Sequence, residues 1–195
     1  MALPAATLSE QAPCIGRGRS GVLYLLEPPK GPKIARKVFD SGTLTRLVQY
    51  AFLGAANPYA WSEHAIRGAF LRRRILAELV PLAFNDSMQV ARALGHGWDE
   101  KRAAMTLDTE YIDGSYPALH HPLNREGSKD TDELRLQLLP KLQELLRETG
   151  FDGMLWLAGL GNPVAFANFL LREDAQGGKR WYWVDLESGV PALFP

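Results

Sequence analysis

The chain has 195 residues, enough for one large domain or for two small lobes that share a cleft. Hydrophobic residues make up 46% and charged residues 23% of it, values that are typical of globular proteins and exclude a disordered chain. The 22 basic and 22 acidic residues give a net charge of zero, which argues against a general binder of nucleic acids or membrane surfaces.

Cysteine usage and hydropathy exclude further classes. Cys14 is the only cysteine, which excludes an internal disulfide and a cysteine-based zinc site. No apolar run approaches the roughly 18 residues of a membrane-spanning helix. Residues 1–13 lack the charged start and long apolar run of a secretory signal. We therefore expect a cytoplasmic protein without a membrane span.

The first half of the chain is predicted to be rich in strands. Residues 14–26 form two apolar runs around a glycine turn, and residues 34–39 suit a further strand. A helix is predicted at 43–53. The clearest helix is predicted at 62–82, with Ser62 as its N-cap and apolar residues at helical spacing.

The second half is predicted to alternate strands and a helix. Strands are expected at 89–94 and 103–112, joined by the turn-rich segment GHGWDEK. A second strong helix is expected at about 131–148, with Gly150 as its C-terminal cap. Together with a hairpin near the C-terminus, this order of elements predicts an α+β architecture.

Gly16, Gly18 and Gly21 form the pattern G-x-G-x-x-G, which fits a Rossmann dinucleotide site or a phosphate loop of the kinase type. A Rossmann loop must open a helix whose N-terminus receives the pyrophosphate. Here the next residues are VLYLLEPP, which favour a strand and end in two prolines. The glycines are therefore predicted at a hairpin tip, where bare backbone amides can fold over phosphates. A glycine turn without a ligand is the alternative.

Lys37 lies on the strand that would pair with this hairpin, and alternation puts it on the same face as Ala35. A lysine beneath a glycine loop can neutralise phosphate charge, whereas a lysine on a strand is otherwise usually solvated. Glu63 on the long helix is predicted to pair with Lys37, and Glu78 is the other carboxylate weighed for this role. The competing explanation for Glu63 is an exposed residue that interacts with the helix dipole.

A hairpin centred on residues 176–177 is predicted from the strand-like runs NFLLR and RWYWVDL. In that register Asn168 faces Asp185. Amide and carboxylate oxygens are ligands that Mg²⁺ prefers, and Glu187 leaves the strand on the same side as a third oxygen ligand. The alternative is an ordinary hairpin whose polar ends are solvated.

In this order the motifs resemble those of the protein-kinase-like superfamily over most of the chain. GRGRSGVLY resembles the glycine-rich loop, and ARKVF resembles the strand that carries the phosphate-binding lysine, here Lys37. TEYIDG is similar to the hinge between the lobes. The resemblance implies that Thr109 is the gatekeeper and that Glu110 and Ile112 offer backbone hydrogen bonds to adenine.

NFLL resembles the segment with the metal-binding asparagine, here Asn168, and VDLESG resembles the DFG segment, with Asp185 as metal ligand. Its DLE form is closer to atypical bacterial or small-molecule kinases than to the eukaryotic type. The resemblance implies ATP and Mg²⁺ as cofactors and catalytic roles for Lys37 and Asp185.

The same resemblance implies a protein-kinase-like two-lobed fold of the α+β class. Its β-rich N-lobe with one long helix would span residues 1–108, and its hinge residues 109–114. Residues 115–195 would form a short or truncated helical C-lobe with the metal-binding hairpin.

One position departs from the family. The aspartate that accepts the proton of the attacking hydroxyl corresponds here to Pro163, and no acidic residue occurs between Gly153 and Arg172. The sequence therefore leaves two functions open. One is phosphoryl transfer to a hydroxyl of a small molecule, lipid, sugar or protein. The other is a pseudokinase, a nucleotide-binding regulatory module that does not transfer phosphate.

Overall fold

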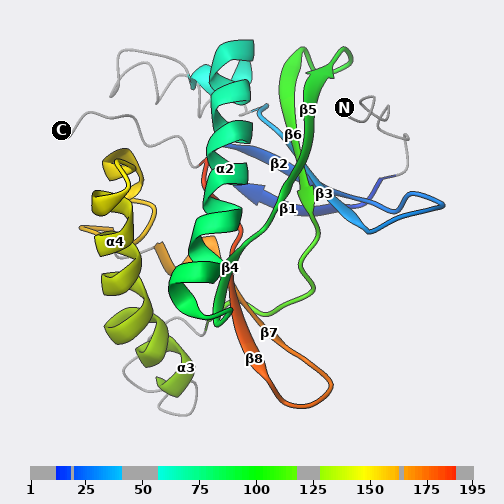
Figure 1. Cartoon of the computed structure of the whole chain (residues 1–195). Coiled ribbons are helices and arrows are strands. Elements are labelled where there is room, and N and C mark those ends of the chain that lie inside the picture. The colour runs from blue at the N-terminus through cyan, green and yellow to red at the C-terminus, as the bar shows by residue number, and fades with distance from the viewer. Residues whose placement is uncertain (1–11, 19, 41–56, 118–127, 163–164, 188–195) are drawn as a thin grey trace. The chain divides into compact units, whose positions relative to one another are not determined.

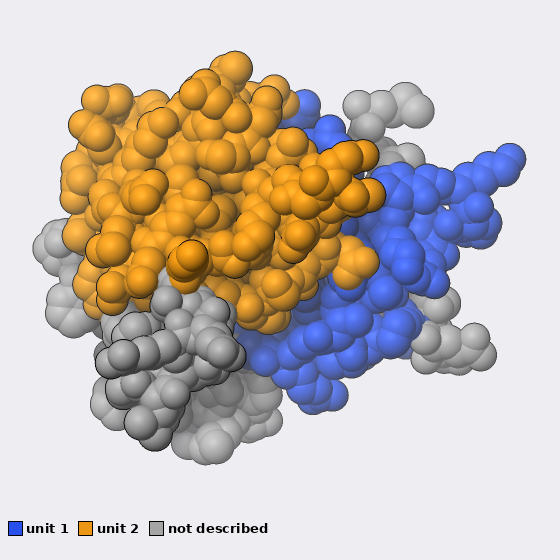
Figure 2. All heavy atoms as spheres, turned by 90° about the horizontal axis from the view of Figure 1, so that it is seen from below, with its two compact units in different colours: residues 1–75, 91–111, 187–195 blue, residues 76–90, 112–186 orange. Residues whose placement is uncertain are grey.

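The computed structural model describes residues 12–18, 20–40, 57–117, 128–162 and 165–187, and Figure 1 shows their helices and strands. The helix predicted at 43–53 lies outside these residues. The chain divides into two compact units, coloured separately in Figure 2. Unit 1 comprises residues 1–75, 91–111 and 187–195, and unit 2 comprises residues 76–90 and 112–186.

Unit 1 contains a five-stranded sheet in which every neighbouring pair is antiparallel. Its strands, in spatial order, are β1 (Cys14–Gly18), β2 (Gly21–Leu26), β3 (Ile34–Val38), β6 (Ala104–Glu110) and β5 (Ala93–Asp99). The segment GHGWDEK was predicted to be turn-rich, but its first five residues belong to β5. Cross-strand pairing with β6 outweighs the low strand propensity of its two glycines.

The long helix α2 (Glu63–Phe84) confirms the prediction for 62–82. The Ser62 side chain caps it by accepting a hydrogen bond from the Ala65 N–H over 3.3 Å. Within unit 1, Ile66 of this helix packs with Phe39 and Leu107 of the sheet in one hydrophobic cluster. The 3₁₀ turn η1 (Pro58–Ala60) precedes α2 and contributes to the same cluster.

Unit 2 has its core around a second helical stretch. This stretch consists of α3 (Ser128–Glu133), the π-helical turn η2 (Leu134–Leu138) and α4 (Leu139–Glu148), and it confirms the predicted helix with three additional residues at its start. Gly150 ends it as predicted, with a φ of +75°. The Phe151 N–H bonds to the Leu146 carbonyl over 2.7 Å, which completes a Schellman cap.

A three-stranded sheet packs on this core. Its order is β4 (Met88–Val90), β8 (Lys179–Trp183) and β7 (Phe169–Glu173), with β4 parallel to β8 and β7 antiparallel to it. The short 3₁₀ turns η3 (Asp152–Met154) and η4 (Ala165–Asn168) lie between α4 and β7 along the chain. The predicted hairpin is therefore present as β7 and β8, drawn in orange and red in Figure 1.

The observed α+β class and the β-rich first half agree with the sequence prediction. The chain passes from unit 1 to unit 2 after Tyr111, inside the segment predicted as a hinge at 109–114. Residues 76–90 were assigned to the N-lobe by the sequence, but their side chains pack in the core of unit 2. In the described part of the chain, no helix has the length and apolarity to cross a membrane.

We predict that Gly21→Ala destabilises the protein by about 1–3 kcal/mol, because a Cβ at this position would lie 2.1 Å from the Val38 carbonyl oxygen. Gly18→Ala is the matched control, since the nearest atom to its Cβ would be 4.0 Å away. Urea unfolding of the two variants measures the difference. Equal free energies of unfolding would contradict the close approach of β2 to β3.

Candidate functional site

The glycine-rich hairpin and Lys37 share one face of the unit 1 sheet. Gly16 of β1 pairs with Leu23 of β2, and Leu23 pairs with Lys37 of β3. Gly18 pairs with Gly21 at the tip of the hairpin. Directly paired residues point to the same side of a sheet, and residues two apart along a strand do so as well. All three glycines therefore lie on the face that carries Lys37. Because they have no side chains, the backbone of the sheet is bare on that face.

Packing explains only one of the three glycines. Gly21 has no room for a Cβ, as described above. A Cβ at Gly16 would meet its nearest atom at 3.8 Å, which is an ordinary contact, and Gly18 is equally open. Neither Gly16 nor Gly18 has a positive φ. The hairpin itself could therefore accommodate side chains at both positions.

Lys37 is half-buried, and its position confirms the predicted alternation along β3. It pairs with Leu107 on β6, and its Nζ lies 5.4 Å from the centre of the Phe39 ring, a cation–π contact. On the opposite face of the sheet, the neighbouring Arg36 forms a bidentate ion pair with Asp108, with both contacts at 2.6 Å.

The predicted pairing of Glu63 with Lys37 is wrong. Glu63 is exposed in the first turn of α2, and within the described part of the chain it forms no ion pair. This agrees with the competing explanation, an acidic residue near the positive end of the helix dipole. Glu78 is also exposed. The buried side of α2 carries a cation, Arg73. The carboxylate that was expected to point inward, Glu63, is exposed.

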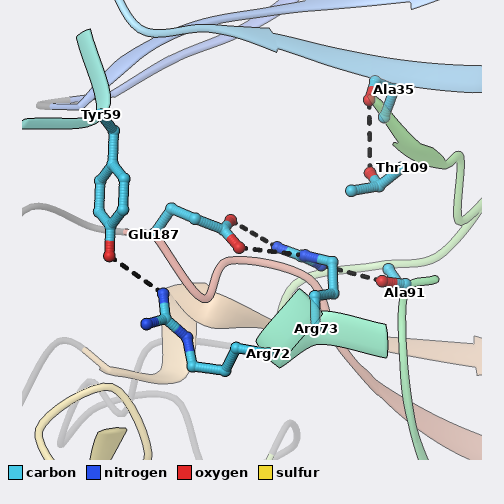
Figure 3. A network of polar contacts seen from close by, with 7 residues as sticks. All are labelled: Ala35, Tyr59, Arg72, Arg73, Ala91, Thr109 and Glu187. Atoms are coloured by element: carbon cyan, nitrogen blue, oxygen red, sulfur yellow. Dashed lines mark hydrogen bonds and ion pairs between the residues drawn. The ribbon is translucent and has the colours of Figure 1, made fainter. Parts of the chain in front are cut away.

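Arg73 binds Glu187 in a buried ion pair that the sequence analysis did not predict (Figure 3). Arg73 Nε donates to Glu187 Oε1 over 3.1 Å, and Nη2 donates to Oε2 over 2.6 Å. Both side chains are 1% exposed. The signal in the sequence was an arginine seven residues after Ile66, within the apolar stripe of a helix.

This ion pair changes the interpretation of Glu187, which the sequence predicted to be a third metal ligand. Both of its carboxylate oxygens accept hydrogen bonds from Arg73. A metal at Glu187 would have to displace a guanidinium from a buried site, which would leave the charge of Arg73 unpaired. Glu187 is therefore better explained by its contact with Arg73.

Thr109, the predicted gatekeeper, and Glu110, one of the two residues predicted to bind adenine, lie in unit 1. Thr109 is buried, and its hydroxyl donates to the Ala35 carbonyl over 3.3 Å (Figure 3). The Glu110 N–H donates to the Arg92 carbonyl, whereas the Arg92 N–H donates to the Glu110 carboxylate over 3.1 Å. Arg92 therefore does not use the Glu110 carbonyl oxygen, the group that would accept a hydrogen bond from a base.

Ile112, the other residue predicted to bind adenine, belongs to unit 2 and is 7% exposed. Its N–H makes no hydrogen bond within the described residues, so a donor is available at the position where the resemblance requires one.

The register of the C-terminal hairpin differs by one residue from the prediction. Phe169 pairs with Trp183, so Asn168 lies opposite Val184 rather than Asp185. The cause is the turn, in which the Asp174 side chain accepts hydrogen bonds from the Gln176 and Gly178 N–H groups. Five residues, an odd number, separate β7 from β8, whereas a hairpin centred on residues 176–177 requires an even number.

Asn168 and Asp185 are nevertheless neighbours in unit 2. The carbonyl oxygen of Asn168 accepts hydrogen bonds from the N–H groups of Val184 and Asp185, at 2.8 Å and 3.3 Å. The Asn168 amide nitrogen donates to the Leu157 carbonyl over 3.0 Å, which orients the side chain. Its Oδ1 accepts no hydrogen bond from the residues that the structure describes.

These two residues fit an Mg²⁺ site. Asp185 supplies a half-buried carboxylate and Asn168 supplies an oriented amide oxygen, which are hard oxygen ligands of the kind that this ion takes, and nucleotide phosphates commonly complete its shell. In the described ranges, no group of three histidine, cysteine or acidic side chains could hold a metal by itself. Pro163, at the position of the missing catalytic aspartate, lies outside the described residues.

Tyr116 is a further residue of this region that the sequence analysis missed. Burial and the nearby Asp185 carboxylate raise the pKa of Tyr116 above its ordinary 10.0. Burial is the larger of the two causes, and the Asp185 charge is the one that a substitution can remove. Because the folded-state pKa is raised, the associated stability is present below pH 10.0 and is lost as the pH rises through the folded value.

We predict that Asp185→Asn lowers the pKa of Tyr116, because it removes the neighbouring negative charge. The measurement is a pH titration of phenolate absorbance, taken as the difference from Tyr116→Phe in each background. Asp152→Asn, a change at an exposed aspartate, is the control. An unchanged pKa in Asp185→Asn would contradict the proximity of the two groups.

Neither a protein-family model nor a curated protein matches this chain. Among solved structures, it is similar to the kinase domain of maize sucrose-induced receptor kinase 1 bound to AMP-PNP, with 13% identity and a TM-score of 0.48 over 94% of this chain and 56% of that one. It is also similar to an apo pseudokinase, with 15% identity and a TM-score of 0.41 over 89% of this chain and 56% of the other. The chain thus spans little more than half of each structure.

Proposed function

We propose that this protein binds ATP together with Mg²⁺. The observation that carries the proposal is the bare sheet face in unit 1. Three glycines and Lys37 share this face, and neither close packing nor a positive φ accounts for Gly16 and Gly18. Glycine where the fold does not need it is expected when a ligand must approach the backbone closely.

The phosphate groups of ATP are the ligand that this face suits. Backbone N–H groups of the hairpin can donate to phosphate oxygens, and the ammonium of Lys37 adds a positive charge. Because Lys37 is half-buried, its charge is less screened by solvent than that of an exposed lysine. By the family resemblance, Thr109 would line the adenine pocket, and the Glu110 carbonyl and Ile112 N–H would bind the base.

Asn168 and Asp185 would hold the magnesium ion. When bound, Mg²⁺ neutralises phosphate charge and helps to orient the nucleotide. The chain's own contribution is to fix the two ligands, through the Asp185 N–H bond to the Asn168 carbonyl and the Asn168 amide bond to Leu157. Lys37 belongs to unit 1 and Asp185 to unit 2, so each part of the proposal has its own test.

Phosphoryl transfer to a hydroxyl acceptor is the activity that this set of residues would support. Positioning and charge stabilisation provide most of the catalysis of phosphoryl transfer, so the reaction does not depend entirely on a general base. The second candidate is a pseudokinase that binds nucleotide without transferring phosphate. Pro163 favours it, because the acceptor proton then has no carboxylate at the usual position.

We predict that ATP with Mg²⁺ stabilises the wild type by about 2.7 kcal/mol when ATP is present at a hundredfold excess over its Kd. Lys37→Ala should weaken ATP binding roughly 10- to 100-fold, because a hydrogen bond to a charged group is worth about 1.5–3 kcal/mol. Lys33→Ala, at an exposed lysine just before β3, is the matched control. Thermal unfolding and calorimetric titration measure both effects.

Asp185→Ala should abolish the dependence of ATP affinity on Mg²⁺ and leave the metal-free affinity little changed, while Asp152→Ala should behave as wild type. A wild type whose unfolding temperature does not respond to ATP with Mg²⁺ would overturn the proposed function. An equal loss of affinity in Lys33→Ala and Lys37→Ala would remove Lys37 from the site.

The two activities differ in ATP turnover. We predict slow turnover, because a general base typically contributes about 10²–10⁴-fold to a rate. Pro163→Asp should raise turnover if the chain is a phosphotransferase that lacks its base. The measurement is release of ADP from radiolabelled ATP by the wild type and by both Pro163→Asp and the control Pro163→Asn. Nucleotide binding without turnover in any of the three would establish the pseudokinase function.

A further inference from the structure

The ion pair between Arg73 and Glu187 is the most completely buried charged contact that the structure describes within unit 1. Figure 3 shows the guanidinium of Arg73 lying edge-on to the Glu187 carboxylate, with the Ala91 carbonyl on its other side. Arg73 Nη1 donates to that carbonyl over 3.0 Å. Both charged side chains are 1% exposed, so the pair is shielded from water.

Stability alone does not account for such a pair. Removing two charges from water is costly, and a well-packed apolar pair of similar size is often as stable or more stable. What a bidentate pair adds is geometry, because the planar guanidinium accepts a carboxylate in only a few orientations. The Arg73–Glu187 pair therefore fixes the position of the backbone at Glu187 more tightly than apolar contacts would.

Because Glu187 lies close to Asp185 in the chain, fixing its backbone also restrains Asp185. Asp185 precedes it by two residues, so covalent geometry keeps their Cα atoms within about 7 Å. The residue between them, Leu186, is 1% exposed and packs in the core of unit 2. The Asp185 N–H is bonded to the Asn168 carbonyl. The short segment that carries Asp185 is thus held immediately before it and immediately after it.

We propose that Arg73 is a positioning residue for Asp185, which it orients through its ion pair with Glu187. This inference rests on the proposed function, in which Asp185 is a ligand of the magnesium ion that accompanies ATP. In this arrangement the long helix supplies the cation and the segment after β8 supplies the carboxylate. Arg73 touches neither the nucleotide nor the metal, and its effect on metal binding is exerted through the backbone of residues 185–187.

The test replaces the ion pair by an apolar pair, in the double variant Arg73→Met/Glu187→Met. The matched control is Arg36→Met/Asp108→Met, which removes the other bidentate pair of unit 1, whose side chains are 4% and 13% exposed. We expect both variants to fold with nearly wild-type unfolding temperatures. Only the first should lose affinity for ATP in the presence of Mg²⁺, by about tenfold or more, with no change in Mg²⁺-free affinity.

A second readout does not need a nucleotide. Hydrogen exchange of the Asp185 amide should be about tenfold faster in Arg73→Met/Glu187→Met than in the wild type, and unchanged in the control. If the double variant fails to fold, Arg73→Lys replaces it. Lysine keeps the charge without the planar fork, so it should give a smaller change in the same direction in both measurements.

The outcomes separate the two claims. Wild-type exchange at Asp185 in the variant, or wild-type affinity for ATP with Mg²⁺, would overturn the positioning role of Arg73. Faster exchange at Asp185 in a protein whose wild type does not bind ATP with Mg²⁺ would overturn the proposed function and leave the anchoring of residues 185–187 in place. Loss of Mg²⁺-free affinity in the variant would show general damage and would also overturn the inference.

Discussion

Cross-strand pairing in the unit 1 sheet decides which chemical groups share a face, and the candidate phosphate site depends on it. The row formed by Gly16, Leu23, Lys37 and Leu107 puts a bare backbone, a cation and a buried leucine side by side on adjacent strands. A slip of one residue between β2 and β3 would move Lys37 to the opposite face. The close contact of Gly21 with Val38 opposes such a slip, because it fits only one alignment of the two strands.

Two buried arginine–carboxylate pairs stabilise unit 1 in different ways. Arg36 and Asp108 are paired across neighbouring strands, so their ion pair reinforces a register that the backbone already sets. Arg73 and Glu187 are 114 residues apart in the chain, and their ion pair ties a helix to the segment that follows β8. In a medium of low polarity either charge alone would be strongly unfavourable. Each carboxylate is therefore paired with its own arginine, and for Glu187 this pairing accounts for a buried charge.

The C-terminal hairpin shows what local sequence patterns can predict and what they cannot. The strand-like runs and the turn residues predicted β7 and β8, and they identified Asn168 and Asp185 as neighbours. The pairing was wrong by one residue because the Asp174 side chain bonds two N–H groups of the turn and so admits an odd number of turn residues. The two residues remain adjacent, since the Asn168 carbonyl bonds the Asp185 N–H directly. A register error of this size changes side-chain orientation and leaves the backbone neighbourhood intact.

The sequence alone was sufficient to predict features that depend on residues a few positions apart. The Ser62 cap, the Gly150 cap and the alternation that places Lys37 all depend on neighbours along the chain, so they could be predicted. The partners of the charged residues could not. Glu63 was expected beside Lys37, whereas the buried partner on α2 is Arg73 and its carboxylate comes from Glu187. Only the tertiary structure decides such pairs, because every charge in a sequence has many opposite charges available, and burial selects among them through long-range packing.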